Sequence, residues 1–137
     1  MVNIPLSKKD PIIQRLKEQL SQNREISFAY LHGSFSEQAE FNDIDVALYL
    51  DDKFVSRIDP LDYEISLSLK LEKKIKIAVD VKILNFAPLC FKYQASCGKL
   101  LFSQNELKRE DFLCSVWSEY FDFQPISKIY LKEGLNA

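Results

Sequence analysis

The amino-acid sequence predicts an α/β (α+β) fold in which helices cover a central mixed sheet, and three observations support this prediction. Helix-like and strand-like stretches alternate along all 137 residues. Hydrophobic residues make up 47% of the chain and charged residues 28%, which is typical of a soluble globular domain. No internal repeat, low-complexity tract or flexible linker interrupts the pattern. We therefore expect one domain over residues 1–137, since this length suffices for a single core.

The first part of the chain predicts one helix and one strand before a glycine turn. Asp10 and Pro11 predict a helix start, because aspartate is a favoured N-cap and proline fits the first helical position. Residues 26–31 are mostly apolar and predict a strand that leads into Gly33. Residues 35–42 are mostly polar and predict a short helix or a loop.

Two later strands are predicted by alternation of apolar and polar residues. In residues 43–50 the aliphatic side chains share one face, while Asp43 and Asp45 share the other. In residues 77–83 Asp80 and Lys82 lie opposite an apolar face. The aliphatic residues on these two apolar faces are Ile44, Val46, Leu48, Leu50, Ile77, Val79, Val81 and Ile83.

Between and after these strands the sequence predicts two helices and an edge strand. Asp59 and Pro60 predict a helix start, and a basic last turn near residue 74 suits the negative end of the helix dipole. The apolar stripe of this helix consists of Leu61, Ile65 and Leu69, with Leu67 and Leu71 beside it. Pro88 predicts a second helix that ends at Gly98, and residues 99–103 predict a short edge strand.

The last predicted helix covers residues 106–121, and we expect the tail after it to be broken by Pro125. Its apolar residues at near-helical spacing are Leu107, Phe112, Leu113, Val116, Trp117 and Tyr120. We expect Trp117 to pack in the core. Phe123 and Tyr130 lie beyond this helix, so the segment from about residue 105 to 137 is a candidate partner-binding element, because aromatic residues are enriched at interfaces.

Composition excludes several classes of protein. The net charge is −2, so no basic field draws the chain to nucleic acid or an anionic membrane. The apolar runs are too short for a membrane span, and the N-terminus lacks the apolar stretch of a signal peptide. Cys90, Cys97 and Cys114 lack metal-ligand spacing, so a zinc site with His32 is not expected. We interpret them as small core residues of a protein in the reducing cytoplasm.

The aspartates predict a divalent metal site. Asp43 and Asp45 are two residues apart on one strand, so their Cα atoms lie roughly 7 Å apart on the same face. Carboxylates this close repel each other unless a cation lies between them, and oxygen ligands suit Mg²⁺ or Mn²⁺. Asp80 would complete a cluster if its strand were the neighbour. Three such carboxylates can hold the two metals of an in-line phosphoryl displacement.

Gly33 and Ser34 fit a phosphate-binding turn. Glycine permits a close backbone approach, and a helix that begins after it would direct N–H groups and the Ser34 hydroxyl at a triphosphate. Each residue also has a plain structural interpretation. Gly33 and Ser34 could form a tight turn with a serine cap, Asp43 could cap a strand, and Asp45 and Asp80 could be exposed strand carboxylates.

These residues carry a resemblance to a known family. The stretch "LHGSFSEQAEFNDIDVALYL" followed by "VDVKIL" resembles the polymerase β-type nucleotidyltransferase superfamily, with its glycine-serine pair, two aspartates separated by one residue and a later third aspartate. The stretches "LSLKLEKKIKIAVDVKILNFAPLCFKYQASCGKLLFS" and "YFDFQPISKIYL" are similar to the minimal nucleotidyltransferase (MNT) antitoxins. The resemblance covers residues 10–133 and implies a polymerase β-like fold.

The resemblance implies a role for each candidate residue. Asp43 and Asp45 would ligate two Mg²⁺ ions and the phosphates of ATP, and Asp80 would complete the second metal site and activate the attacking hydroxyl. Gly33 and Ser34 would hold the β- and γ-phosphates. Family members pair with a HEPN toxin, a small helical ribonuclease, and transfer AMP from ATP to a tyrosine of it, so a hetero-oligomer is expected.

Two alternatives stay open at the level of sequence. The loop 35–42 is shorter than is usual in the family and contains Glu37 and Glu40 but no basic residue, which favours an MNT subunit that neutralises its toxin by binding alone. A small-molecule nucleotidyltransferase is the other alternative, although 137 residues leave little room for a second substrate domain. His32, usually apolar or aromatic in the family, is interpreted as a packed or capping residue that could also touch the nucleotide.

Overall fold

The structure is a computed structural model, and it confirms the α/β class. It describes the backbone of residues 2–3, 6–33, 40–41 and 44–136, and the side chains of residues 11–33 and 44–122. The strands are β1 (Val2–Asn3), β2 (Ile26–His32), β3 (Glu40–Phe41), β4 (Ile44–Leu50), β5 (Val79–Ile83) and β6 (Lys99–Ser103). The helices are α1 (Leu6–Ser21), α3 (Asp52–Val55), α4 (Pro60–Ile75), α5 (Leu89–Ser96) and α6 (Glu106–Asn136).

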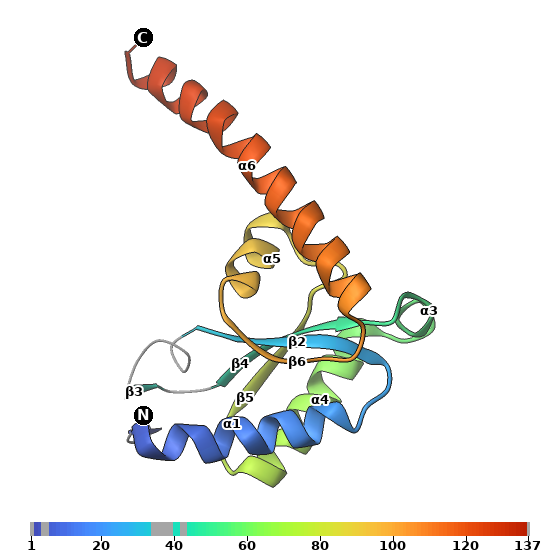
Figure 1. Cartoon of the computed structure of the whole chain (residues 1–137). Coiled ribbons are helices and arrows are strands. Elements are labelled where there is room, and N and C mark those ends of the chain that lie inside the picture. The colour runs from blue at the N-terminus through green and yellow to red at the C-terminus, as the bar shows by residue number, and fades with distance from the viewer. Residues whose placement is uncertain (1, 4–5, 34–39, 42–43, 137) are drawn as a thin grey trace.

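Four of the strands form a mixed sheet with the order β5-β4-β2-β6 (Figure 1). β2 pairs antiparallel with both β4 and β6, whereas β4 and β5 run parallel. β5 follows β4 through α4, the crossover connection that a parallel pair requires. β6 lies at one edge, as its short sequence predicts, and β5 lies at the other.

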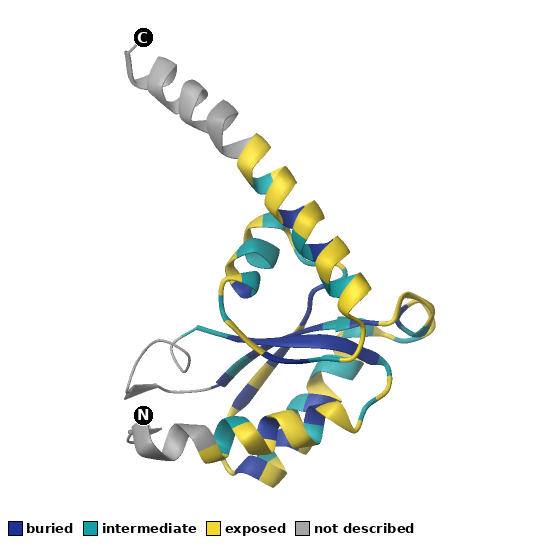
Figure 2. Ribbon diagram, viewed as in Figure 1, coloured by how far each residue is buried: buried dark blue, intermediate teal, exposed yellow. Residues whose placement is uncertain are grey.

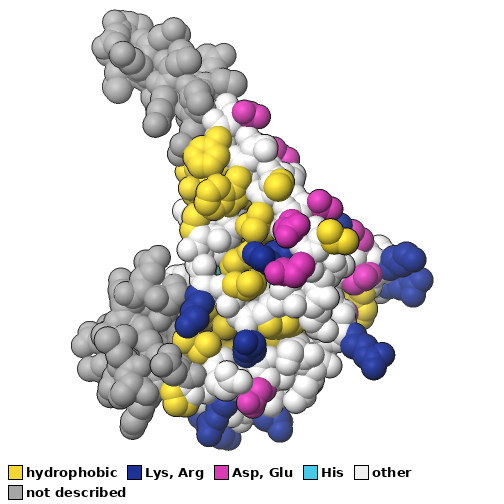
Figure 3. All heavy atoms as spheres, viewed as in Figure 1, with side chains coloured by type: hydrophobic (Ala, Val, Ile, Leu, Met, Phe, Trp, Pro, Cys, Tyr) yellow, Lys and Arg dark blue, Asp and Glu magenta, His cyan; other side chains and the backbone are white. Residues whose placement is uncertain are grey.

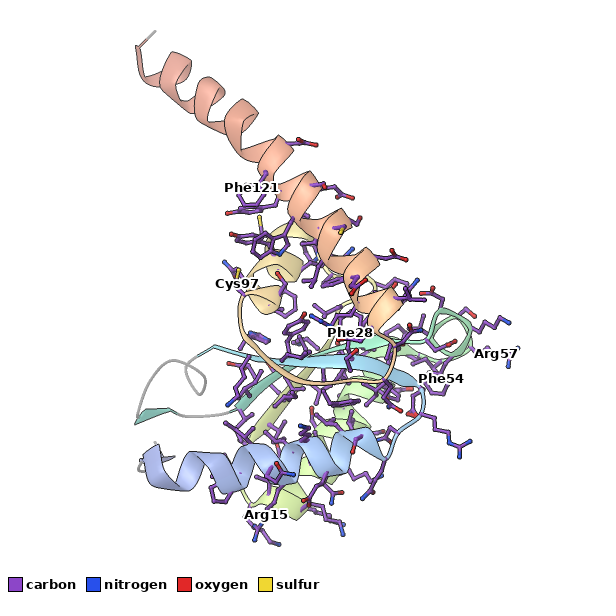
Figure 4. The ribbon with its side chains drawn as sticks, viewed as in Figure 1. Arg15, Phe28, Phe54, Arg57, Cys97 and Phe121 are labelled. Carbon is purple, nitrogen blue, oxygen red and sulfur yellow. The ribbon has the colours of Figure 1, made fainter. Side chains whose placement is uncertain are left out.

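Helices cover both faces of this sheet. α1 and α4 lie against one face, and α5 with the first part of α6 lies over the other (Figure 1). The first core contains the aliphatic residues predicted for β4 and β5, all of which are buried. The second core contains Phe28 of β2, which lies between the sheet and α6 (Figure 4) and packs against Phe112 with ring centroids 5.3 Å apart. The buried residues line the sheet in Figure 2.

The structure confirms several predicted element boundaries. Asp59 caps α4 by accepting hydrogen bonds from the N–H groups of Leu61 at 3.0 Å and Asp62 at 3.4 Å. α4 ends at Ile75, and Lys76 caps it in a left-handed conformation with φ 67°. Within the part of the chain that the structure describes, no helix is long and apolar enough to cross a membrane.

Two helix boundaries differ from the prediction. α1 begins at Leu6, so Pro11 lies inside the helix instead of at its start. α6 continues to Asn136 through Pro125, so the tail predicted after residue 121 is helical. The fixed φ of proline is itself a helical value, so a helix can pass through it at the cost of one backbone hydrogen bond. The predicted loop 35–42 falls mostly outside the described residues, but its residues 40 and 41 form β3, which pairs with β1.

The interpretation of Trp117 and the three cysteines as core residues is wrong. Trp117 is 39% exposed and its Nε1 donates a hydrogen bond to Ser96 Oγ at 3.0 Å. Cys90, Cys97 and Cys114 are all exposed and unpaired as thiols. They lie on or next to α5 and α6, whose inward faces are filled by other residues, namely Ala95, Phe112 and Val116.

Side chains of α4 cover the open edge of β5. The N–H groups of three alternate strand residues donate to α4: Val79 to Glu72 Oε1 at 3.1 Å, Val81 to Ser68 Oγ at 3.2 Å, and Ile83 to Glu64 Oε2 at 2.8 Å. The three acceptors follow one another at intervals of four residues along α4. This spacing matches that of the three N–H donors, which are two residues apart along β5. Unpaired edge groups are a template for aggregation, and α4 satisfies these donors within the chain.

We predict that Ser68→Ala lowers the free energy of unfolding by about 1 kcal/mol, because it leaves the Val81 N–H without its acceptor. Ser66→Ala is the matched control. Ser66 is exposed on the same helix, so the two variants change helix propensity equally. Urea unfolding of both variants measures the difference, and equal stabilities would show that the Ser68 bond contributes nothing.

Candidate active site

The sheet places three polar side chains in one row across neighbouring strands. Asp45 of β4 pairs with His32 of β2 on one side and with Asp80 of β5 on the other. Neighbouring strands lie about 4.8 Å apart, so the row is about 10 Å long. The condition for Asp80 to join the cluster, that its strand adjoins the strand of Asp45, is therefore met. Two like charges in direct register repel each other, which favours a cation between them.

Gly33 lies beside this row, and its lack of a side chain matters for the position of Asp45. It has φ +78°, a left-handed conformation that side chains disfavour. A Cβ atom added to it would lie 2.3 Å from Asp45 Oδ2. The glycine thus turns the chain after β2 and leaves room for the carboxylate of Asp45. The turn that the sequence predicts at Gly33 is therefore present, and its close approach to a phosphate stays a prediction.

His32 is the third member of the row, at the end of β2. Its ring meets the ring of Phe91 on α5 edge-on, with centroids 5.2 Å apart, as expected for a packed residue. Burial lowers the pKa of His32, and the negative charge of Asp80 partly opposes this shift. The imidazole is therefore neutral at pH 7. Its buried Nε2 has no hydrogen-bond partner among the described residues.

Asp80 marks the solvent-exposed end of the row. Lys82 Nζ lies 3.9 Å from Asp80 Oδ1, and both side chains are about half exposed, so this ion pair is weak. Asp80 and Lys82 also line a groove of about 340 Å³ between β5 and α4. Asp80 is therefore open to solvent on this side of the sheet.

The structure brings together part of the predicted metal site. Asp45 and Asp80 supply carboxylate oxygens from adjacent strands, a donor type that suits Mg²⁺ or Mn²⁺. Asp43 and Ser34 lie outside the described residues. The described residues alone contain no group of three or more acidic, histidine or cysteine side chains that could hold a metal ion. The two carboxylates fit the predicted site, and its third ligand stays a prediction.

We predict that Gly33→Ala costs about 2 kcal/mol of stability, about half of it from the left-handed backbone and the rest from the contact with Asp45. In an Asp45→Ala background only the backbone cost should remain, about 1 kcal/mol. Urea unfolding of the two single variants and the double variant measures this coupling. If Gly33→Ala costs the same in both backgrounds, the contact with Asp45 is not the reason for the glycine.

Comparisons with solved structures reveal the same fold in MNT antitoxins. One match is a tri-AMPylated Shewanella oneidensis HEPN toxin in complex with MNT antitoxin, with 21% identity over 93% of this chain and 98% of that chain and a TM-score of 0.69. A toxin–antitoxin structure with AMP-PNP matches with 24% identity over 93% and 98% and a TM-score of 0.66. The toxin–antitoxin pair MntA–HepT matches with 21% identity over 92% and 98% and a TM-score of 0.67.

A family model agrees with these matches. No curated protein matches the sequence. The model of the polymerase beta nucleotidyltransferase domain matches residues 14–107, which is more than half of the chain and includes Gly33, Asp45 and Asp80. The chain therefore belongs to the polymerase beta nucleotidyltransferase family.

Proposed function

We propose that this protein is an antitoxin that transfers AMP from ATP to a tyrosine hydroxyl of a cognate HEPN toxin, using Mg²⁺ or Mn²⁺. The observation that carries the proposal is the register of Asp45 with Asp80 beside Gly33. The family assignment supports nucleotidyl transfer. A protein acceptor is supported by similarity to an antitoxin in complex with a tri-AMPylated HEPN toxin. ATP as donor is supported by the similar fold that was crystallised with AMP-PNP.

The proposed reaction is an in-line displacement. The tyrosine oxygen forms a bond to the α-phosphorus of ATP, the bond from that phosphorus to the bridging oxygen breaks, and pyrophosphate leaves. Asp80, at the open end of the row, accepts the tyrosine proton. Asp45 holds the nucleotide end of the site together with Asp43, and Gly33 and Ser34 hold the β- and γ-phosphates. These carboxylates would hold a divalent metal, which would supply the positive charge that the phosphates require.

Aromatic side chains at the junction of α5 and α6 support the existence of a protein partner. Hydrophobic residues gather there on the face shown in Figure 3. Trp117 and Phe121 are 39% and 49% exposed, and the rings of Tyr93 and Tyr120 stack 3.7 Å apart. Exposed aromatic clusters are typical of interfaces. Phe123 and Tyr130, also candidates for partner contact, have side chains outside the described residues, so their role remains a prediction.

We predict that Asp45→Asn and Asp80→Asn each reduce AMP transfer by at least about 100-fold. Each substitution removes a negative carboxylate that would bind the metal or accept the proton of the attacking hydroxyl. Asp62→Asn on α4 is the matched control. Intact mass of the partner after incubation with ATP and Mg²⁺ is the measurement, and a chelator should abolish the AMP increment. If the Asp45→Asn protein neutralises toxicity fully and the unmodified chain adds no mass, neutralisation occurs by binding alone.

We also predict that Glu37→Gln tightens ATP binding about two- to fivefold, since it removes a negative charge from the loop expected to face the phosphates. Glu18→Gln, on the exposed side of α1, is the charge-matched control. Titration of ATP with Mg²⁺ by calorimetry measures both affinities. An unchanged affinity for Glu37→Gln would mean that this side chain points away from the nucleotide.

A further inference from the structure

One face of α4 carries an apolar stripe that is exposed to solvent. The sequence pattern predicts this stripe as an apolar helix face. Leu61, Ile65 and Leu69 are 61%, 50% and 59% exposed, and we refer to them as the α4 stripe. The residues of α4 that enter the core are instead Leu67, Leu71 and Ile75. Three large aliphatic side chains on one exposed helical face form more than the scattered apolar surface of ordinary proteins, and such patches mark interaction sites.

The α4 stripe borders a trough that leads to the candidate active site. One wall of the 340 Å³ groove is the α4 stripe, and the other is β5 with Asp80 and Lys82. A second groove, of about 490 Å³, shares Leu61 and Lys82 with the first and reaches Phe86, which is 64% exposed. A molecule that lies in this trough therefore contacts apolar side chains of α4 and the residue Asp80 at once.

The chemistry of the trough selects a helix as its occupant. An added strand would need the outward N–H groups of β5, and those of Val79, Val81 and Ile83 already donate to α4. The α4 stripe has the four-residue spacing that complements the apolar face of another helix. Lys70 and Lys73 are exposed at its C-terminal end and form no ion pair with the described residues. Glu72 lies in the same hollow, but its carboxylate accepts the Val79 N–H, and the two lysines leave this end with net positive charge, which favours acidic side chains on the occupant.

We infer that the trough between α4 and β5 is the docking site for an amphipathic helix of the acceptor protein, with its apolar face on the α4 stripe and acidic residues beside Lys70 and Lys73. This inference rests on the proposed function, because an acceptor protein must bring its hydroxyl to Asp80. A helix in this trough lies against β5 and so places the acceptor next to the open end of the row. The aromatic cluster of α5 and α6 is formed by other elements and is not required for this contact.

The test is a binding titration of the intact acceptor protein against the double variant Ile65→Ser/Leu69→Ser. We expect the dissociation constant to rise about tenfold or more, while the affinity for ATP and the transfer rate at saturating acceptor stay unchanged. Leu107→Ser is the matched control, since Leu107 is a 77% exposed leucine on α6 away from the trough. Lys73→Glu should also weaken binding, with Lys17→Glu on α1 as its control.

Each result decides between the inference and its competitors. If the double variant binds the acceptor as tightly as the unmodified protein and transfer is intact, the trough is not the docking site. The proposed function then still stands. Absence of binding and transfer in the unmodified protein overturns the proposed function, and the inference with it. A dimer of the unmodified chain that dissociates in the double variant shows that a second copy occupies the trough instead. Tighter acceptor binding by Ser68→Ala, which frees the Val81 N–H, would indicate an added strand and overturn the helix.

Discussion

The parallel pairing of β4 and β5 is the constraint on which the candidate site depends. In both strands alternate aliphatic residues, such as Val46 and Val81, must face the core formed with α1 and α4. A slip of one residue in either strand would turn an aspartate into that core, at a cost of several kcal/mol. Hydrophobic burial on one face therefore fixes the positions of Asp45 and Asp80 on the other. The register of the two carboxylates is therefore fixed by buried residues on the other face of the sheet.

Because β4 and β5 pair in this way, α4 has three faces with different surroundings. One side buries Leu71 and its neighbours beneath the sheet, and the next side satisfies the N–H groups of β5 with residues such as Ser68. The third side carries the α4 stripe. Because α4 closes the edge with side chains instead of a further strand, β5 keeps its polar face accessible. Protection against aggregation and access to Asp80 thus come from one arrangement.

On the face of the sheet that carries the row of polar residues, aromatic side chains of α5 and α6 pack against β2. Phe91 of α5 packs edge-on against His32, and burial there keeps the imidazole neutral despite the nearby charge of Asp80. Further along the sheet Phe28 and Phe112 fill the space beneath α6. Phe91 limits access of water to the His32 side of the row, so electrostatic interactions there are stronger than they would be in open solvent.

The sequence by itself determined the strand faces, the starts of α4 and α5, and the identity of Gly33, Asp45 and Asp80 as candidate site residues. Each of these depends on local periodicity, capping or backbone freedom, which neighbouring residues along the chain reveal. Only the tertiary structure decided the order of the strands, the contact of Gly33 with Asp45, and the exposure of the α4 stripe and Trp117. The two apolar stripes of α4 look alike in sequence, and only the position of the sheet determines which of them is buried.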